Sequence, residues 1–112
     1  MGTLFKLFFG ASPEGGSDIP ELIRNGAVVI DVRTAQEFAT GHISGSVNIP
    51  YDQIDRLSGD VEKDRPIILY CHSGGRSAAA KRMLEQSGYS RVIDGGGLNR
   101  MQKLLAEHPE RP

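Results

Sequence analysis

Residues 66–77 read Pro-Ile-Ile-Leu-Tyr-Cys-His-Ser-Gly-Gly-Arg-Ser and carry the strongest structural signal in the chain. The stretch opens with a short apolar run rich in β-branched residues, which is typical of a strand buried on both faces in a parallel sheet. Polar residues and two glycines follow, and residues 77–86 are rich in helix formers up to Gly88. The stretch therefore predicts a strand, a tight loop and a helix, with Cys71 at the end of the strand.

The same alternation continues on both sides of this stretch. Further strands are predicted at residues 27–32, 46–49 and 91–94. Helices are expected to start at Asp18, Thr34, Asp52, near Arg76 or Ser77, and after Gly97. Because strands and helices alternate, we expect a three-layer α/β/α domain with a four- or five-stranded, mostly parallel sheet. Functional sites in such sheets lie at the carboxyl ends of the strands, which is where Cys71 falls.

The length of 112 residues suits one domain, which we place at residues 18–112. Residues 1–17 are interpreted as an N-terminal arm and linker. The arm begins with ten largely apolar residues, too few for a membrane span, and we expect it to pack on the domain. A peripheral membrane foot or a docking segment is the alternative. Residues 3–9 are the candidate for an opening strand.

Charge and cysteine content exclude several classes of function. The 13 basic and 14 acidic residues give a net charge of -1, so neither a nucleic acid nor a membrane is an expected partner. The single cysteine excludes an internal disulfide and a multi-thiolate metal site, and no His, Asp or Glu set has metal-ligand spacing. We expect no metal and a cytoplasmic location, although a lone thiol is also compatible with the periplasm.

The loop after Cys71 has the composition expected around a reactive thiolate. A thiol attacks only when it is deprotonated. Gly74 and Gly75 allow tight curvature that turns backbone N–H groups toward one point, and the following helix directs its positive end at the loop. Arg76 adds a full positive charge. Hydroxyl donors are available at Ser73 and Ser77. Together these groups are expected to lower the pKa of the thiol; the alternative is a simple glycine-rich turn.

His72 is an obvious candidate for a base paired with Cys71. Adjacent loop residues usually point apart, however, and the sequence shows no third group to orient the imidazole. We therefore expect His72 to form an exposed wall of the loop.

Other polar residues and glycines have structural explanations. We expect Asp31 and Arg33 to form an ion pair or loop anchor at the end of a strand. Glu37 is interpreted as a helix cap, in a capping box with Thr34, and His42 as structural. We expect the glycines at Gly95–Gly97 to permit a close approach of the backbone beside the Cys71 loop. The alanines at Ala78–Ala80 are expected to allow close packing of a helix on the sheet.

Three ordered motifs resemble the rhodanese family. The first motif is VIDVR at 29–33, continued by Glu37-Phe38, Gly41-His42-Ile43 and GSVNIP at 45–50; the second is LYC at 69–71 with the loop to Ser77; the third is residues 92–98. The resemblance runs from about residue 18 to 106. The absence of a tryptophan after Gly97 resembles the short single-domain, phage-shock-type members.

The resemblance implies a rhodanese-like fold and a thiosulfate sulfurtransferase. Cys71 would take the outer sulfur of thiosulfate and pass it to cyanide or to a thiol such as glutathione or thioredoxin, without a metal or an organic cofactor. The implied substrate-binding residues are His72, Ser73, Gly74, Gly75, Arg76 and Ser77. Backbone N–H groups of residues 72–76 would hold the persulfide, and Arg76 and the serines would lie near the oxyanion of the donor.

Two alternatives remain at this point. The first is a Cys-dependent phosphatase, whose loop has the pattern Cys-x5-Arg and is large enough to surround a phosphate. In this chain the spacing from Cys71 to Arg76 is Cys-x4-Arg, which gives a smaller loop that fits a sulfur atom. The other alternative is a non-catalytic sulfur carrier or regulatory binding module. Modules of that kind commonly lose the cysteine, whereas this chain keeps it within a complete loop.

Overall fold

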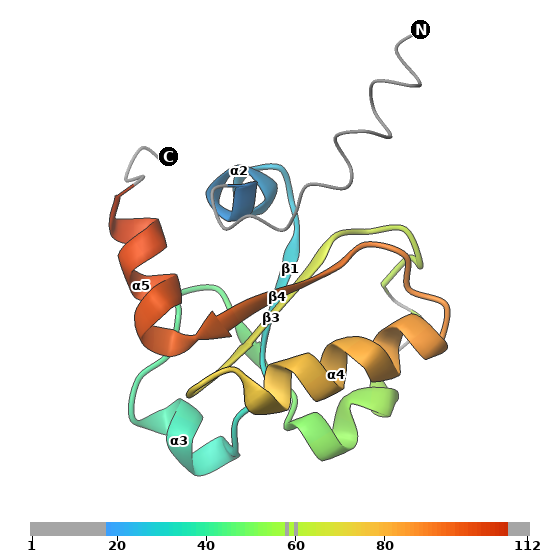
Figure 1. Cartoon of the computed structure of the whole chain (residues 1–112), viewed down its shortest axis with the longest axis horizontal. Helices are drawn as coiled ribbons and strands as arrows, with labels where there is room; N and C mark the ends of the chain where they lie inside the picture. Colours follow the sequence, from blue (N-terminus) through green and yellow to red (C-terminus); the bar gives the residue numbers. More distant parts are fainter. Residues whose placement is uncertain (1–17, 58, 60, 108–112) are drawn as a thin grey trace, which may run out of the picture.

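One parallel sheet organises the domain. The computed structural model describes residues 18–57, 59 and 61–107. The four strands are β1 (Val28–Asp31), β2 (Val47–Asn48), β3 (Ile67–Cys71) and β4 (Val92–Gly97), in the order β2-β1-β3-β4 (Figure 1). The chain places β2 on one side of β1 and β3 on the other, so the strand order reverses around β1. Ligand sites of open parallel sheets occur beside such a reversal, at the carboxyl ends of the strands.

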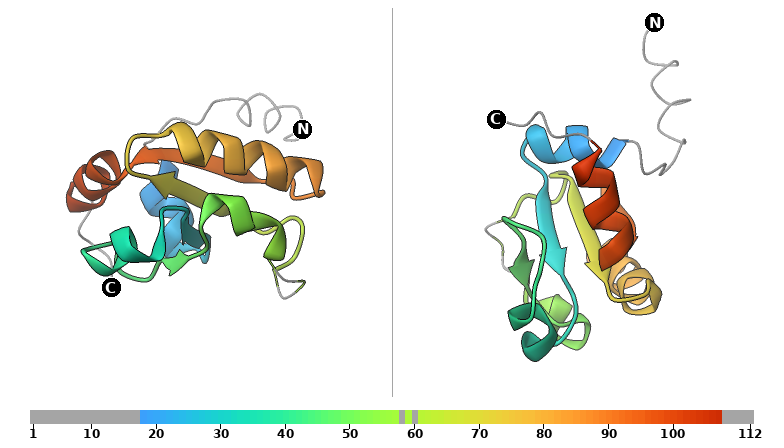
Figure 2. Two further views of the ribbon diagram at one scale, coloured as in Figure 1. Left: turned by 90° about the horizontal axis from the view of Figure 1, so that it is seen from below. Right: turned by 90° about the vertical axis from the view of Figure 1, so that its left-hand side faces the viewer.

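Helices cover both faces of this sheet. The long helix α4 (Gly75–Gln86) lies beside the 3₁₀ helix η2 (Tyr51–Arg56) on one face (Figures 1 and 2). On the other face, α2 (Ile19–Arg24) lies near α5 (Leu98–Ala106). The short helix α3 (Ala35–Ala39) follows β1 at its carboxyl end. The predicted three-layer α/β/α architecture is therefore confirmed, with four strands in the described residues.

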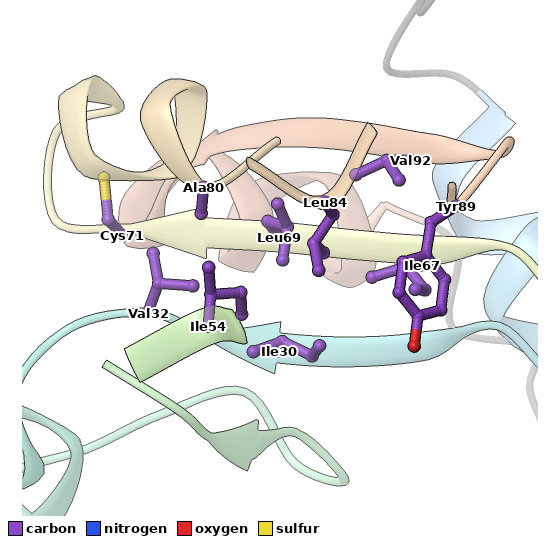
Figure 3. Close-up of a cluster of buried hydrophobic side chains, with 10 residues drawn as sticks. All are labelled: Ile30, Val32, Ile54, Ile67, Leu69, Cys71, Ala80, Leu84, Tyr89 and Val92. Atoms are coloured by element: carbon purple, nitrogen blue, oxygen red, sulfur yellow. The ribbon is translucent and has the colours of Figure 1, made fainter. Parts of the chain in front are cut away.

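Strand β3 is the centre of the hydrophobic core. All five of its residues are buried, as expected for a strand covered on both faces. Because side chains alternate along a strand, Ile67, Leu69 and Cys71 belong to the cluster under α4 and η2 (Figure 3), whereas Ile68 and Tyr70 belong to the cluster under α2 and α5. Cys71 is therefore part of the hydrophobic core and is also the last residue of β3.

Several predicted helix ends differ from the structure. Asp18 precedes α2, but its side chain makes no capping hydrogen bond. Asp52 is not a cap, because Pro50 precedes η2 and Asp52 lies in its first turn. Helix α4 begins at Gly75, one or two residues before the expected start at Arg76 or Ser77, and β4 continues through the glycines at 95–97.

The N-terminal arm and the opening strand considered at residues 3–9 lie outside the described residues. Within the described part of the chain, no helix combines the length and the apolar character needed to span a membrane.

Candidate active site

The sulfur of Cys71 lies inside the loop that joins β3 to α4. Cys71 is 1% exposed, and Figure 3 shows its side chain extending from the strand end toward the start of α4. The backbone N–H of Gly74 donates to Sγ at 2.9 Å. Gly74 has φ of +106°, which favours glycine and turns the chain back over the sulfur. The predicted curved loop around the thiol is confirmed.

Hydrogen bonds set the protonation of this thiol. Burial acts to raise the pKa of Cys71. A hydrogen bond that the Ser77 hydroxyl donates when it turns to the thiolate lowers the pKa, as do the backbone N–H groups of Ser77, Gly74 and Arg76. The pKa lies below the ordinary value of a thiol as the net result. The thiolate fraction at neutral pH is correspondingly larger, and the thiolate is the form that attacks.

The remaining loop residues divide into buried and exposed positions. Ser77 is fully buried beside the sulfur, whereas His72, Ser73 and Gly75 are exposed. His72 thus occupies the exposed position expected for a wall of the loop.

Arg76 has a partner that the sequence did not suggest. Its guanidinium donates to Glu37 Oε1 at 2.9 Å and to Glu37 Oε2 at 3.1 Å, which joins α4 to α3. The predicted capping box of Glu37 with Thr34 is confirmed, so one carboxylate serves both the helix cap and the arginine. The Arg76 bond, aided by the Thr34 N–H, lowers the pKa of Glu37 to about 2. The positive charge of Arg76, which interacts with Cys71, is therefore partly neutralised.

Asp94 is a second residue that the sequence reasoning missed. Its Oδ1 accepts a hydrogen bond from Ser77 Oγ at 2.7 Å and another from the backbone N–H of Gly96 at 2.9 Å. Asp94 thus lies one hydroxyl group away from Cys71. The available signal was a carboxylate at the end of the predicted strand 91–94, which follows the Cys71 helix in the chain.

The predicted ion pair of Asp31 and Arg33 is confirmed and is buried. Arg33 Nη2 lies 2.8 Å from Asp31 Oδ2, and Arg33 Nε donates to both carboxylate oxygens at 3.0 and 3.1 Å. Arg33 also donates to the Gly41 carbonyl at 2.6 Å, which fixes the turn after α3. His42 accompanies this turn as a structural residue, because its ring stacks on Phe38 with 3.6 Å between centroids. These residues support the loops around the site.

The closing glycines give β4 close access to the Cys71 loop. Gly97 pairs with Cys71 in the sheet register, and a Cβ built on Gly97 would lie 2.5 Å from the His72 carbonyl oxygen. Gly97 has extended backbone angles, so the need for glycine comes from this approach and not from φ. The expected close backbone approach at these glycines is confirmed.

Gly97→Ala is expected to destabilise the fold by about 1–3 kcal/mol, because the added methyl group meets backbone that cannot rotate away. The displaced loop should also react more slowly at Cys71. Urea unfolding and the rate of Cys71 alkylation measure the two effects. Gly59→Ala is the matched control, since nothing lies within 4 Å of its Cβ position. Equal stability of the two variants would contradict the proposed contact.

No group of three or more His, Cys, Asp or Glu able to hold a metal ion occurs among the described residues. The site combines a buried thiol, backbone N–H groups directed at it and an arginine–carboxylate pair. Comparison with known proteins agrees with this geometry, because residues 17–100 match the model of the rhodanese-like domain. The chain belongs to the rhodanese family.

Rhodanese relatives of the chain include named sulfurtransferases. Thiosulfate sulfurtransferase GlpE of Ectopseudomonas mendocina (strain ymp) is 41% identical over 78 residues, which cover 68% of this chain and 72% of that protein. YrkF of Bacillus subtilis (strain 168), named provisionally as a sulfur carrier protein, is 33% identical over 66 residues, covering 59% and 36%. A solved rhodanese with anions from E. coli is 32% identical with a TM-score of 0.64, covering 67% of this chain and 91% of that chain.

Proposed function

We propose that this rhodanese domain is a thiosulfate sulfurtransferase that carries sulfur as a persulfide on Cys71. The observation that supports this most is the 2.9 Å hydrogen bond from the Gly74 N–H to Sγ, within a loop that lowers the thiol pKa. The same N–H groups that favour a thiolate also favour a persulfide anion held in its place. The family relatives named thiosulfate sulfurtransferase agree with this assignment.

The reaction has two displacements. The Cys71 thiolate attacks the outer sulfur of thiosulfate, a new S–S bond forms, and the S–S bond of thiosulfate breaks with its electron pair leaving on sulfite. An acceptor, either cyanide or a thiol such as glutathione or thioredoxin, then attacks the outer sulfur of the persulfide. The bond to Sγ breaks, and Cys71 leaves as a thiolate. Backbone N–H groups of residues 72–76 hold the anionic sulfur in this proposal, and Arg76, Ser73 and Ser77 lie near the donor.

The alternative is a domain that carries sulfur to a partner without turning over small donors. The sulfur-carrier name of one relative supports keeping it. Incubation with thiosulfate, removal of the excess and measurement of the intact mass test the first half-reaction. Addition of cyanide, glutathione or reduced thioredoxin then tests the second. Loading followed by multiple turnovers is expected; loading from a protein persulfide but never from thiosulfate would favour the carrier. Aryl phosphate serves as the phosphatase control and should not be hydrolysed.

The pair of Arg76 and Glu37 predicts two opposite changes in donor binding. Arg76→Ala removes the positive charge near the thiol and is expected to raise the Michaelis constant for thiosulfate about tenfold, the effect of one charge-assisted hydrogen bond. Glu37→Gln keeps a side chain that can cap α3 but releases Arg76, and should lower the constant by up to roughly fivefold. Steady-state kinetics at several thiosulfate concentrations measure both constants.

Stability is the control for these two variants. The side chains of Arg76 and Glu37 are 32% and 36% exposed, and exposed ion pairs contribute only about 0–1 kcal/mol. Both variants should therefore keep nearly the melting temperature of the wild type. A large loss of melting temperature with an unchanged Michaelis constant would show that Arg76 is structural and does not bind the donor.

A further inference from the structure

The Ser77 hydroxyl lies among three possible acceptors. Ser77 is fully buried, and its Oγ lies 2.7 Å from Asp94 Oδ1, 3.1 Å from the Gly74 carbonyl oxygen and 3.6 Å from Cys71 Sγ. A hydroxyl group has one hydrogen to donate and two lone pairs with which to accept. Donation to Asp94 and donation to the sulfur therefore exclude each other.

Asp94 is the strongest of these competitors. Hydrogen bonds to a carboxylate are shorter and about twice as strong as those between neutral groups, and 2.7 Å is a short contact. The Gly96 N–H, at 2.9 Å, holds the same carboxylate oxygen in place. With the hydroxyl hydrogen on the Asp94 side, a lone pair of Ser77 faces Cys71, and the thiol S–H can donate to it across 3.6 Å.

We propose that Asp94 is a positioning residue for Cys71: it holds the only hydroxyl hydrogen of Ser77, turns a Ser77 lone pair toward the sulfur, and thereby favours the protonated thiol. The proposed ionisation breaks only the S–H bond, whose electron pair stays on sulfur while the proton passes to solvent. The Ser77 hydrogen can then turn to the thiolate, which leaves Asp94 with the Gly96 N–H alone.

The position of Asp94 balances the loop that favours the thiolate. The Ser77 hydroxyl, when it donates to the sulfur, and the backbone N–H groups of Ser77, Gly74 and Arg76 favour ionisation of the thiol. A thiolate that is too stable is a weaker nucleophile, and the best attacking thiols titrate near the ambient pH. Asp94 opposes the N–H groups through Ser77 and so keeps Cys71 both ionisable and nucleophilic. The benefit for nucleophilic attack rests on the proposed sulfur transfer, whereas the hydrogen bonds of Asp94 and Ser77 do not depend on it.

Other charged groups on the elements around the loop must be considered in the titration of Cys71. Arg76 on α4 interacts with Cys71 through its charge, and its partner Glu37 belongs to α3. The elements around the loop also carry the Asp31–Arg33 pair at the carboxyl end of β1, exposed His72, and Arg100 on α5, which donates to the Gly95 carbonyl at 2.7 Å. The charge of Asp94 also disfavours a thiolate through space, so the route through Ser77 must be separated from this effect.

A double-mutant cycle makes that separation. The variants are Asp94→Asn, Ser77→Ala and the double variant, with Asp64→Asn as a control for loss of an exposed carboxylate at the opposite end of β3. The rate of alkylation by iodoacetamide is measured against pH by intact mass. The chain has one cysteine, so each alkylated molecule reports Cys71. The midpoint of the profile is compared, because access to the sulfur scales the rate without moving the midpoint.

Asp94→Asn is expected to lower the midpoint by about one pH unit, because Ser77 becomes free to donate to the thiolate. Ser77→Ala should move the midpoint by less than roughly half a unit when Asp94 is present, and raise it by about one unit in the Asp94→Asn background. Asp64→Asn should not move it. A role confined to folding would change the melting temperature and leave the midpoint in place.

Two results would overturn the proposal. An unmoved or raised midpoint in Asp94→Asn would exclude it, and so would an equal shift with and without Ser77, which would leave only a through-space charge effect. Should Asp94→Asn not fold, Ser77→Ala alone decides: a rise of a full unit would show that the hydroxyl donates to sulfur even beside Asp94. The proposed function is judged apart, by thiosulfate loading. Shifted alkylation midpoints without any loading would retain the role of Asp94 and reject sulfur transfer.

Discussion

Cys71→Ser is expected to abolish the gain of a sulfur atom from thiosulfate. The serine hydroxyl has nearly the same shape and is also buried, but it remains protonated and does not attack sulfane sulfur. Removal of the nucleophile from covalent catalysis commonly costs several orders of magnitude, so a loss of at least about a thousandfold is expected. Intact mass after incubation with thiosulfate measures loading, and thiocyanate formed on adding cyanide measures turnover.

A displaced cysteine supplies the control for this prediction. The double variant Cys71→Ser, Ser87→Cys keeps one thiol but moves it to the exposed carboxyl end of α4, far along the helix from the loop. It should gain no sulfur above the Cys71→Ser background. Loading of the displaced thiol at the wild-type rate would mean that the Cys71 loop contributes nothing, and the sulfurtransferase assignment would fail.

Asp31→Ala is expected to destabilise the protein by about 3–5 kcal/mol, because it leaves a buried guanidinium without its carboxylate. Asp31 is 0% exposed and Arg33 only 3% exposed, so water cannot replace the lost partner. Small domains have net stabilities of about 5–15 kcal/mol, and such a loss removes a large part of that margin. Equilibrium unfolding in urea measures the change.

The exposed pair of Lys81 and Glu85 on α4 is the matched comparison. Lys81 Nζ lies 2.7 Å from Glu85 Oε2, slightly closer than the atoms of the buried pair. The two side chains are nevertheless 34% and 44% exposed. Glu85→Ala should cost less than about 0.5 kcal/mol. If Asp31→Ala cost no more than Glu85→Ala, the Gly41 carbonyl alone would be sufficient to hold Arg33, and burial would not decide the strength of the pair.

Local sequence patterns were sufficient for most of the fold. The apolar run before Cys71, the capping box at Thr34 and the two-residue spacing of Asp31 and Arg33 each determine their structure over a few residues. Buried β3, the cap of α3 and the ion pair of Asp31 with Arg33 were accordingly predicted, whereas the burial of that pair was not. Pro50 shows the limit of such patterns, because the chain after it forms a 3₁₀ helix in which Asp52 caps nothing.

The parts of the site that were missed depend on contacts distant in sequence. Glu37 and Arg76 are 39 residues apart, and Ser77 and Asp94 are 17 apart. Each pair meets only when the strands align, and the register of β3 with β4 shifts between Leu69 and Cys71. One sequence does not contain that register. Glu37 was also already explained by its capping box, which gave no reason to look for a second partner.

The lone cysteine of the chain has a kinetic consequence for the proposed sulfur transfer. A persulfide on Cys71 has no second thiol in the same chain to attack it, so its release requires collision with another molecule. The lifetime of the loaded state should then fall in inverse proportion to the acceptor concentration. Each chain would hold at most one such sulfur atom. When the acceptor is scarce, most of the protein would remain in the persulfide form and turnover would be slow.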